Sequence, residues 1–193
     1  KASTIRIFFK YLHSHLGVID SNPALLLDTP QIKKSLPRHL SLDESIKLLG
    51  CVDGPNKERD YCILTLFLNC GLRLSELCGL NITDIRPDGN MRVLGKGNKE
   101  RMVYFGSACR KALDIYLVER NKKVLTDNRA LFASRNGNRI SVTAVHRLVD
   151  KALLQAGIDP TQFSAHKLRH TAATLMYQHG QVDIRVLKDI LGH

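Results

Sequence analysis

Apolar side chains recur at intervals of three and four residues along most of the chain, which predicts a mainly helical protein. The first such segment covers residues 4–16, where one helix face would carry Ile5, Phe8, Phe9, Leu12 and Leu16. A single helix cannot bury so apolar a face by itself. We therefore expect residues 1–20 to be the last helix of an N-terminal domain whose other helices lie outside this sequence.

A proline-rich segment follows over residues 21–40. It holds half of the six prolines together with several basic residues: Pro23, Pro30, Pro37, Lys33, Lys34 and Arg38. Proline at this density predicts an extended linker between two domains. A basic linker could lie along a phosphate backbone or be a solvated hinge, and the sequence leaves both readings open.

The largest domain is expected over residues 41–193. A capping box of Ser41 and Glu44 predicts the start of its first helix. Helical periodicity predicts further helices over residues 59–69, 74–79, 108–119, 142–156, 166–179 and 184–191. Alternating patterns predict short strands over residues 82–85, 91–94 and 101–105. The predicted fold class is therefore mostly α with a small three-stranded antiparallel β-sheet (α+β).

Charge and cysteine content narrow the classes of function. The 193 residues include 29 Lys and Arg against 18 Asp and Glu, a formal net charge of +11. This excess predicts a polyanionic partner, most often nucleic acid, although a merely basic enzyme is the alternative. The five cysteines are scattered without a C-x-x-C pair, which favours reduced thiols in the cytoplasm over disulfides or zinc ligands. No apolar run approaches the roughly 18 residues of a membrane span, and no motif indicates a cofactor or metal.

Two segments carry candidate chemistry. In residues 166–171, with the sequence HKLRHT, His166 and Arg169 would share one helix face and could bind phosphate and move a proton. The alternative is a solvated helix face. Arg73 follows a glycine in an apolar run and has Glu76 three residues further on, so it is either half of a structural ion pair or a rigid cation aimed at an anion.

Two further cations stand in distinctive local sequence. Lys96 lies between two glycines in the loop that joins the second and third predicted strands, where the backbone can approach a ligand closely. An ordinary hairpin loop with a solvated lysine is the alternative. His193 follows Leu191 and Gly192 at the end of the last predicted helix.

Four motifs in this order resemble those of the tyrosine recombinases, most of all the Xer-type enzymes and the phage and transposon integrases. They are GLRLSEL at residues 71–77, GKGNKER at 95–101, HKLRHT at 166–171 and LGH at 191–193. The resemblance covers residues 41–193 and implies the fold of that family's catalytic domain. Type IB topoisomerases share the pocket chemistry, but the second and fourth motifs favour a recombinase. Residues 1–20 and 21–40 resemble the end of the family's core-binding domain and its interdomain linker.

The resemblance also implies roles for individual residues. Arg73 and Arg169 would hold the scissile phosphate, and Glu76 would support the first arginine. Lys96 would protonate the departing 5′ oxygen. His166 would assist proton transfer, and His193 would donate a hydrogen bond to the phosphate. The family needs no metal or cofactor, because arginines supply the charge. The position that matches His170 is regarded as structural in that family.

The resemblance implies site-specific DNA recombination or integration through a 3′-phosphotyrosine, including transposition of mobile elements. The partners would be double-stranded DNA recombination sites and three further copies in a synaptic homotetramer, in a bacterial cytoplasm. The nucleophilic tyrosine should stand about nine residues beyond the LGH motif, hence after residue 193. Of the tyrosines present, Tyr11, Tyr61, Tyr104, Tyr116 and Tyr177, none fits, and we interpret Tyr177 as a packing residue.

We therefore expect the chain to bind DNA without cutting it. Two alternatives predict different biology. One is a non-catalytic DNA-binding regulator, or a degenerate relic, on the same fold. The other is a basic RNA-binding module, which has less support because stacking aromatic residues are not interleaved with the basic ones.

Overall fold

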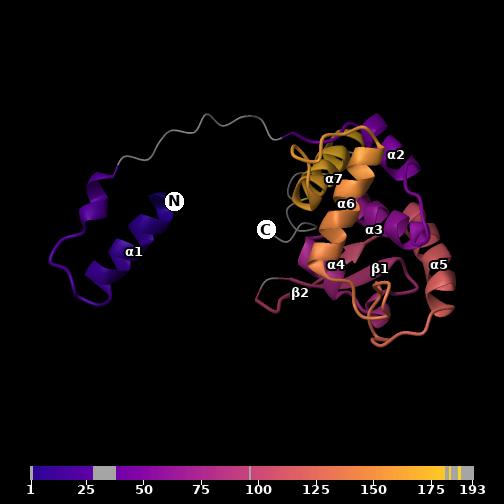
Figure 1. Cartoon of the computed structure of the whole chain (residues 1–193), viewed down its shortest axis with the longest axis horizontal. Helices are drawn as coiled ribbons and strands as arrows, with labels where there is room; N and C mark the ends of the chain where they lie inside the picture. Colours follow the sequence, from indigo (N-terminus) through magenta and orange to yellow (C-terminus); the bar gives the residue numbers. More distant parts are fainter. Residues whose placement is uncertain (1, 28–37, 96, 181–182, 184–186, 188–193) are drawn as a thin grey trace. The chain divides into compact units, whose positions relative to one another are not determined.

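The computed structural model describes residues 2–27, 38–95, 97–180, 183 and 187. The chain separates into two compact units, Lys1–Leu36 and Pro37–His193 (Figure 1). The division falls inside the segment predicted to be a linker. The assignment of the units to particular domains of a larger protein stays a prediction.

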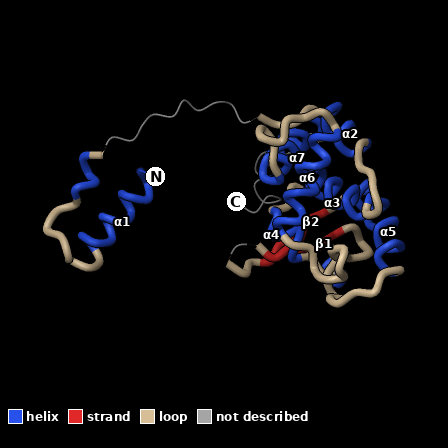
Figure 2. Tube along the Cα trace, viewed as in Figure 1, coloured by secondary structure: helices blue, strands red, loops and turns tan. Residues whose placement is uncertain are grey.

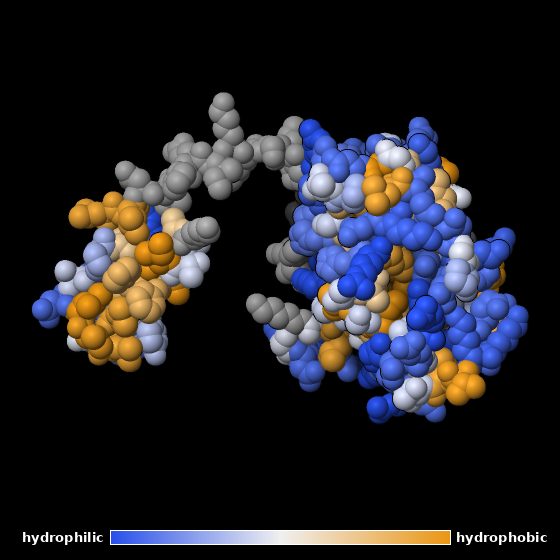
Figure 3. Space-filling model, viewed as in Figure 1, coloured by the Kyte–Doolittle hydropathy of each residue, from blue (hydrophilic) through white to orange (hydrophobic). Residues whose placement is uncertain are grey.

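The first unit contains the helix α1 (Ala2–Ser14) and a 3₁₀ turn, η1 (Pro23–Leu26), which Asn22 caps by accepting a hydrogen bond from the Ala24 backbone. The predicted amphipathic helix is confirmed, but none of its residues is buried. Ile7 and Phe8 are 69% and 56% exposed, and apolar side chains cover much of the face of this unit that Figure 3 shows. The described part of the unit therefore does not cover the apolar face of α1.

The second unit is built around α3, which is buried along most of its length. Its helices are α2 (Leu42–Gly50), α3 (Lys57–Cys70), α4 (Leu74–Gly79), α5 (Ser107–Asn121), α6 (Val142–Gln155) and α7 (Ala165–His179). α3 packs against both α5 and α7. Residues 62–68 of α3 are all buried, as expected of a helix that is apolar nearly all round. The prediction of a mostly helical domain is confirmed.

The ends of two helices follow from local chemistry. The predicted capping box is present: the Glu44 backbone N–H donates to Ser41 Oγ (3.1 Å), and the Ser41 backbone N–H donates to Glu44 Oε2 (2.8 Å). At the other end, Gly71 stops α3 in the left-handed conformation, with φ of 56°. This turn places the next residues, Leu72 and Arg73, in an extended segment before α4 begins.

The sheet differs from the prediction. Within the described residues it has two antiparallel strands, β1 (Asn90–Leu94) and β2 (Glu100–Tyr104), with Val93 opposite Arg101 (Figure 2). The strand predicted over residues 82–85 is wrong: Ile82–Asp84 forms a 3₁₀ turn, and Ile85 makes only an isolated bridge to Met91. Asp84 Oδ2 accepts a hydrogen bond from the Asn81 backbone (2.8 Å), and this local capping outweighs the alternating pattern.

Two other expectations can be compared with the structure, and a third falls mostly on residues that it does not describe. All five cysteines are free, and four of them are buried. None of the described helices is long and apolar enough to cross a membrane. The helix predicted over residues 184–191 lies outside the described residues, apart from Leu187.

Candidate anion-binding site

A cavity of about 540 Å³ lies where the start of α4 meets α6 and α7 in the second unit. It is lined by Leu72, Arg73, Leu74, Ser75, Val142, His146, Ala165, His166, Arg169 and His170. Three of the five residues expected to be catalytic, Arg73, His166 and Arg169, thus share one cavity although Arg73 is more than ninety residues from the other two in the chain. The other two, Lys96 and His193, lie outside the described residues.

Arg73 is held at the entrance of α4 by Glu76. The Glu76 carboxylate reaches back one turn and accepts hydrogen bonds from the Arg73 backbone N–H (2.8 Å) and from Arg73 Nη1 (2.7 Å). The predicted Arg73–Glu76 ion pair is therefore present. Because Arg73 also lines the cavity, the ion pair and an anion-binding role are compatible rather than alternatives.

Arg169 reaches the same carboxylate from α7. Its Nη1 donates to the Gly71 carbonyl oxygen (2.8 Å) and lies 3.8 Å from Glu76 Oε2, and its side chain is 6% exposed. Gly71 therefore helps to position both arginines. Arg73 follows it by two residues in the chain, and Arg169 binds the Gly71 carbonyl oxygen. The side chain of Arg169 is not part of a solvated helix face, which was the alternative left open by the sequence.

A third arginine joins the cluster from the β-hairpin. Arg101, on β2, donates from Nη1 to Glu76 Oε1 (2.8 Å) and from Nη2 to Glu76 Oε2 (2.9 Å). Sequence reasoning gave Arg101 no role, although the residue ends the GKGNKER motif. It could not be found by helical spacing, because its partner lies on a different element.

The electrostatics of the cluster favour an anion. Burial by itself would raise the pKa of Glu76, but hydrogen bonds from Arg101 and Arg73 lower it to about 2. Burial and the neighbouring charge of Arg73 lower the pKa of Arg169 to about 10, despite the opposing effect of Glu76. Three guanidinium groups thus gather at one carboxylate, and two of them, those of Arg73 and Arg169, also line the cavity, an arrangement that attracts an anion.

Histidines form the outer wall of the cavity. His166 and His170 lie one turn apart on the exposed face of α7, with their Nε2 atoms 3.1 Å apart and their rings edge to face. His170, for which a structural role was expected, thus contacts His166 and lines the same cavity; its role stays a prediction. His146 on α6 is a further lining residue that sequence reasoning missed, because only the packing of α6 against α4 brings it there.

No tyrosine lines this cavity. Tyr116 is buried and donates a hydrogen bond to the Leu131 carbonyl oxygen (3.0 Å). Tyr177, interpreted from the sequence as a packing residue, is 59% exposed, so that interpretation is wrong. Across the described ranges, no three His, Cys, Asp or Glu side chains are grouped so that they could hold a metal ion.

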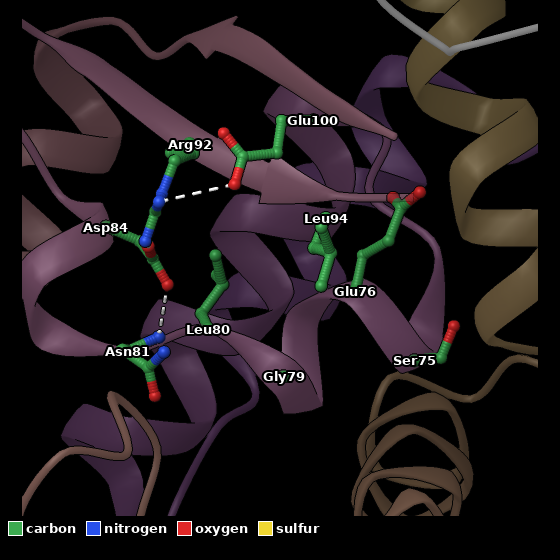
Figure 4. A pocket seen from close by; sticks show the side chains of 9 residues that line it. All are labelled: Ser75, Glu76, Gly79, Leu80, Asn81, Asp84, Arg92, Leu94 and Glu100. Atoms are coloured by element: carbon green, nitrogen blue, oxygen red, sulfur yellow. Dashed lines mark hydrogen bonds and ion pairs between the residues drawn. The ribbon is translucent and has the colours of Figure 1, made fainter. Parts of the chain in front are cut away.

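A smaller cleft of about 200 Å³ lies between α4 and the β-hairpin (Figure 4). It is lined by Ser75, Glu76, Gly79, Leu80, Asn81, Asp84, Arg92, Leu94 and Glu100. Arg92 on β1 binds Asp84 (2.8 Å) and Glu100 (3.3 Å) across it. One arginine thus faces two carboxylates here, whereas three arginines share the carboxylate of Glu76.

The chain is similar to known proteins over most or all of its length. Residues 38–193 match the model of the phage integrase family. The tyrosine recombinase XerC of Caldanaerobacter subterraneus subsp. tengcongensis is 51% identical over 193 residues, which are all of this chain and 54% of that protein. The tyrosine recombinase XerD of Proteus mirabilis is 39% identical over 198 residues, covering 99% of this chain and 62% of that protein.

The fold of the chain is also similar to those of solved recombinase structures. The crystal structure of XerA recombinase superposes with a TM-score of 0.74 at 30% identity, covering all of this chain and 65% of that one. XerH recombinase bound to its difH substrate superposes with a TM-score of 0.71 at 26% identity, covering 86% of this chain and 50% of that one. The chain therefore spans between half and two thirds of the length of the relatives it matches.

Proposed function

Since the chain belongs to the phage integrase family of tyrosine recombinases, we propose that its second unit is the catalytic domain of an enzyme for site-specific DNA recombination or integration. On this proposal, residues 1–20 are the end of a core-binding domain and residues 21–40 are the linker. The double-stranded DNA of a recombination site is the substrate. Four copies would act together in the synaptic complex.

The observation that carries the proposal is the cavity that Arg73 and Arg169 share. Exchange at a phosphodiester places negative charge on the non-bridging oxygens of a five-coordinate phosphorus. Fixed guanidinium groups stabilise that charge more than the charge of the ground state, which lowers the barrier. Both arginines are fixed before any anion arrives, Arg73 by Glu76 and Arg169 by the Gly71 carbonyl oxygen.

The remaining roles concern protons. A tyrosine oxygen would attack the scissile phosphorus to form a 3′-phosphotyrosine, while the 5′ oxygen leaves and takes up a proton. We assign that proton to Lys96, and assistance in proton transfer to His166, which lines the cavity. His193 would donate a hydrogen bond to the phosphate. Because the phosphotyrosine keeps the energy of the broken bond, rejoining requires no ATP.

The attacking tyrosine is not among residues 1–193 on this proposal. None of the five tyrosines of the sequence lines the cavity. We therefore expect the 193-residue chain to bind DNA and the phosphate without forming a covalent adduct. A protein–DNA adduct that survives denaturation of this chain would contradict that assignment.

Duplex binding tests the choice of substrate. Fluorescence anisotropy with a 30-base-pair duplex of mixed sequence, repeated over a salt series, should show affinity that falls steeply with salt. The variants Arg73→Ala and Arg169→Ala should reduce the salt slope by about 1, as expected for the loss of one phosphate contact. Tighter binding to an RNA duplex or to single-stranded RNA than to DNA would favour the RNA-binding alternative.

Orthovanadate tests whether the cavity is catalytic. Vanadate can adopt the five-coordinate geometry of the transition state, whereas inorganic phosphate cannot, so a catalytic cavity should bind vanadate more tightly. We expect vanadium NMR titrations to show such binding, and Arg73→Ala and Arg169→Ala to abolish it. Equal affinity for vanadate and phosphate, unaffected by these variants, would instead favour a non-catalytic DNA-binding protein.

A further inference from the structure

We propose that Arg101 is a positioning residue of this site, which holds Glu76 from the β-hairpin so that Arg73 and Arg169 stay directed into the anion cavity. The inference rests on the proposed function, because it assigns a task within the same site. Arg101 is not among the residues that line the cavity, so it would act through Glu76 rather than on the phosphate.

The geometry of the contact is the first argument. Arg101 directs both terminal guanidinium nitrogens at the two oxygens of Glu76, at 2.8 and 2.9 Å. This is the bidentate arrangement in which arginine and carboxylate bind most strongly and with a defined orientation. The side chains are 15% and 2% exposed, so solvent screens the pair little.

The division of charge is the second argument. A carboxylate held only by Arg73 and Arg169 would attract both guanidinium groups towards itself. With Arg101 bound to both oxygens, Glu76 has its own counter-ion, and Arg169 remains 3.8 Å from it. Arg73 Nη1 also binds Glu76 Oε1 at 2.7 Å, so Arg101 adds a second strong contact to the carboxylate and limits how far Arg169 is drawn towards it.

The hairpin itself is the third argument. Gly95, at the end of β1, donates its N–H to the Lys99 carbonyl oxygen (2.8 Å) and closes the neck of the loop. A Cβ on Gly95 would lie 3.5 Å from Arg101 Nη1 and 3.7 Å from Glu76 Oε1. The neck of the loop therefore packs directly on the Arg101–Glu76 pair. Lys96 follows Gly95 in the sequence. The Arg101–Glu76 pair therefore connects the residue before Lys96 to the arginines around Glu76.

Arg92 provides a matched control on the same hairpin. It is an arginine on β1 with two carboxylate partners, Asp84 and Glu100, but it does not contact Glu76. Replacing Arg92 by glutamine removes one charge and one ion-paired arginine from the sheet. Any effect shared by Arg92→Gln and Arg101→Gln is therefore a general effect on the hairpin.

The test measures orthovanadate affinity by vanadium NMR for the whole chain and its variants, together with thermal unfolding. We expect Arg101→Gln to weaken vanadate binding at least about tenfold, since the bidentate charged contact is lost. Arg101→Lys keeps the charge but cannot span both oxygens, and should recover part of the affinity. Arg92→Gln should stay within about twofold of the parent chain, because the ion pairs of Arg92 are with Asp84 and Glu100 and not with Glu76.

A second readout separates positioning from general stability. The carboxyl carbon signal of Glu76, followed by NMR against pH, should titrate at higher pH in Arg101→Gln than in the parent chain, and should be unchanged in Arg92→Gln. Among the described residues, Arg73, Arg101 and Arg169 are the charged groups that face this carboxylate. If Arg101→Gln does not fold, Arg101→Lys alone decides the question.

The outcomes distinguish this inference from the function on which it rests. Vanadate binding that requires Arg73 and Arg169 but is within about twofold of normal in both Arg101 variants would overturn the role of Arg101 and leave the proposed function standing. Absence of vanadate binding to the parent chain would overturn both. An equal loss of affinity in Arg92→Gln and Arg101→Gln would also overturn the role of Arg101.

Discussion

Arg101 and Glu76, 25 residues apart in the sequence, form a bidentate ion pair with two N–O distances of 2.8 and 2.9 Å. The same carboxylate also binds the side chain and the backbone of Arg73. One acidic side chain on α4 therefore connects a helix junction with the β-hairpin. Its charge state matters for the stability of the fold as well as for the anion site.

Replacement of Glu76 should change the acid stability of the chain. The pKa of Glu76 is lowered from 4.5 to about 2 in the folded state. A carboxyl group with a lowered folded pKa stabilises the native state above its unfolded pKa, and this contribution disappears as the pH falls from about 4.5 through about 2. The difference corresponds to roughly 3 kcal/mol in the free energy of unfolding.

Urea unfolding at several pH values checks this prediction. Glu76→Gln should be less stable than the parent chain by roughly 3 kcal/mol near neutral pH, and the gap should close as the pH approaches about 2. Glu119→Gln removes the same charge from an exposed pair with Lys122 and serves as the control; it should cost less than about 1 kcal/mol at any pH. A gap for Glu76→Gln that does not vary with pH would contradict the assignment.

Arg120 should be required for stability and not for anion binding. It is 4% exposed, lies on α5 and donates hydrogen bonds to the carbonyl oxygens of Asn128, Ala130 and Leu131. Arg120→Met would remove these donors from the Asn128 and Ala130 carbonyl groups and leave Leu131 with its bond from Tyr116, at a cost of roughly 2–4 kcal/mol in the free energy of unfolding.

Chemical unfolding and the vanadate titration together test Arg120. We expect the large loss of stability with unchanged vanadate affinity under conditions where the variant is folded. Lys122→Met, two residues away on the surface, should change the free energy of unfolding by less than about 0.5 kcal/mol. A variant of Arg120 as stable as the parent chain would contradict this role, because it would show that the Asn128 and Ala130 carbonyl groups find other donors.

The helices and part of the site could be predicted from the sequence because both depend on short spacings. Helical periodicity located α3 and α7, and the spacing of Arg73 and Glu76 gave their ion pair. The contact of Glu76 with Arg101 could not be predicted, because it depends on how α4 packs beside the hairpin. The same holds for His146, which reaches the cavity only through the packing of α6 against α4. The error at residues 82–85 has a local cause, the hydrogen bond from the Asn81 backbone to Asp84.

Gly95 lies beside the Arg101–Glu76 pair, so a side chain at this position should disturb the pair. An added methyl group would lie 3.3 Å from the Lys99 carbonyl oxygen, tighter than most such contacts, and 3.5 Å from Arg101 Nη1. Gly95→Ala must therefore widen the neck or displace the Arg101 guanidinium. We expect a loss of roughly 1 kcal/mol in the free energy of unfolding, as for other overpacked sites, and an affinity for vanadate about threefold weaker or more.

Gly79→Ala is the matched control, because a Cβ at Gly79, the last residue of α4, would meet nothing within 4 Å. In that helical position alanine should be neutral or stabilise the chain by up to about 1 kcal/mol, with vanadate affinity unchanged. If Gly95→Ala binds vanadate as tightly as Gly79→Ala, the spacing between the loop neck and the ion pair is not what sets the position of the arginines. If only Gly95→Ala weakens vanadate binding, the position of the backbone at Gly95 affects the positions of the arginines that bind the anion.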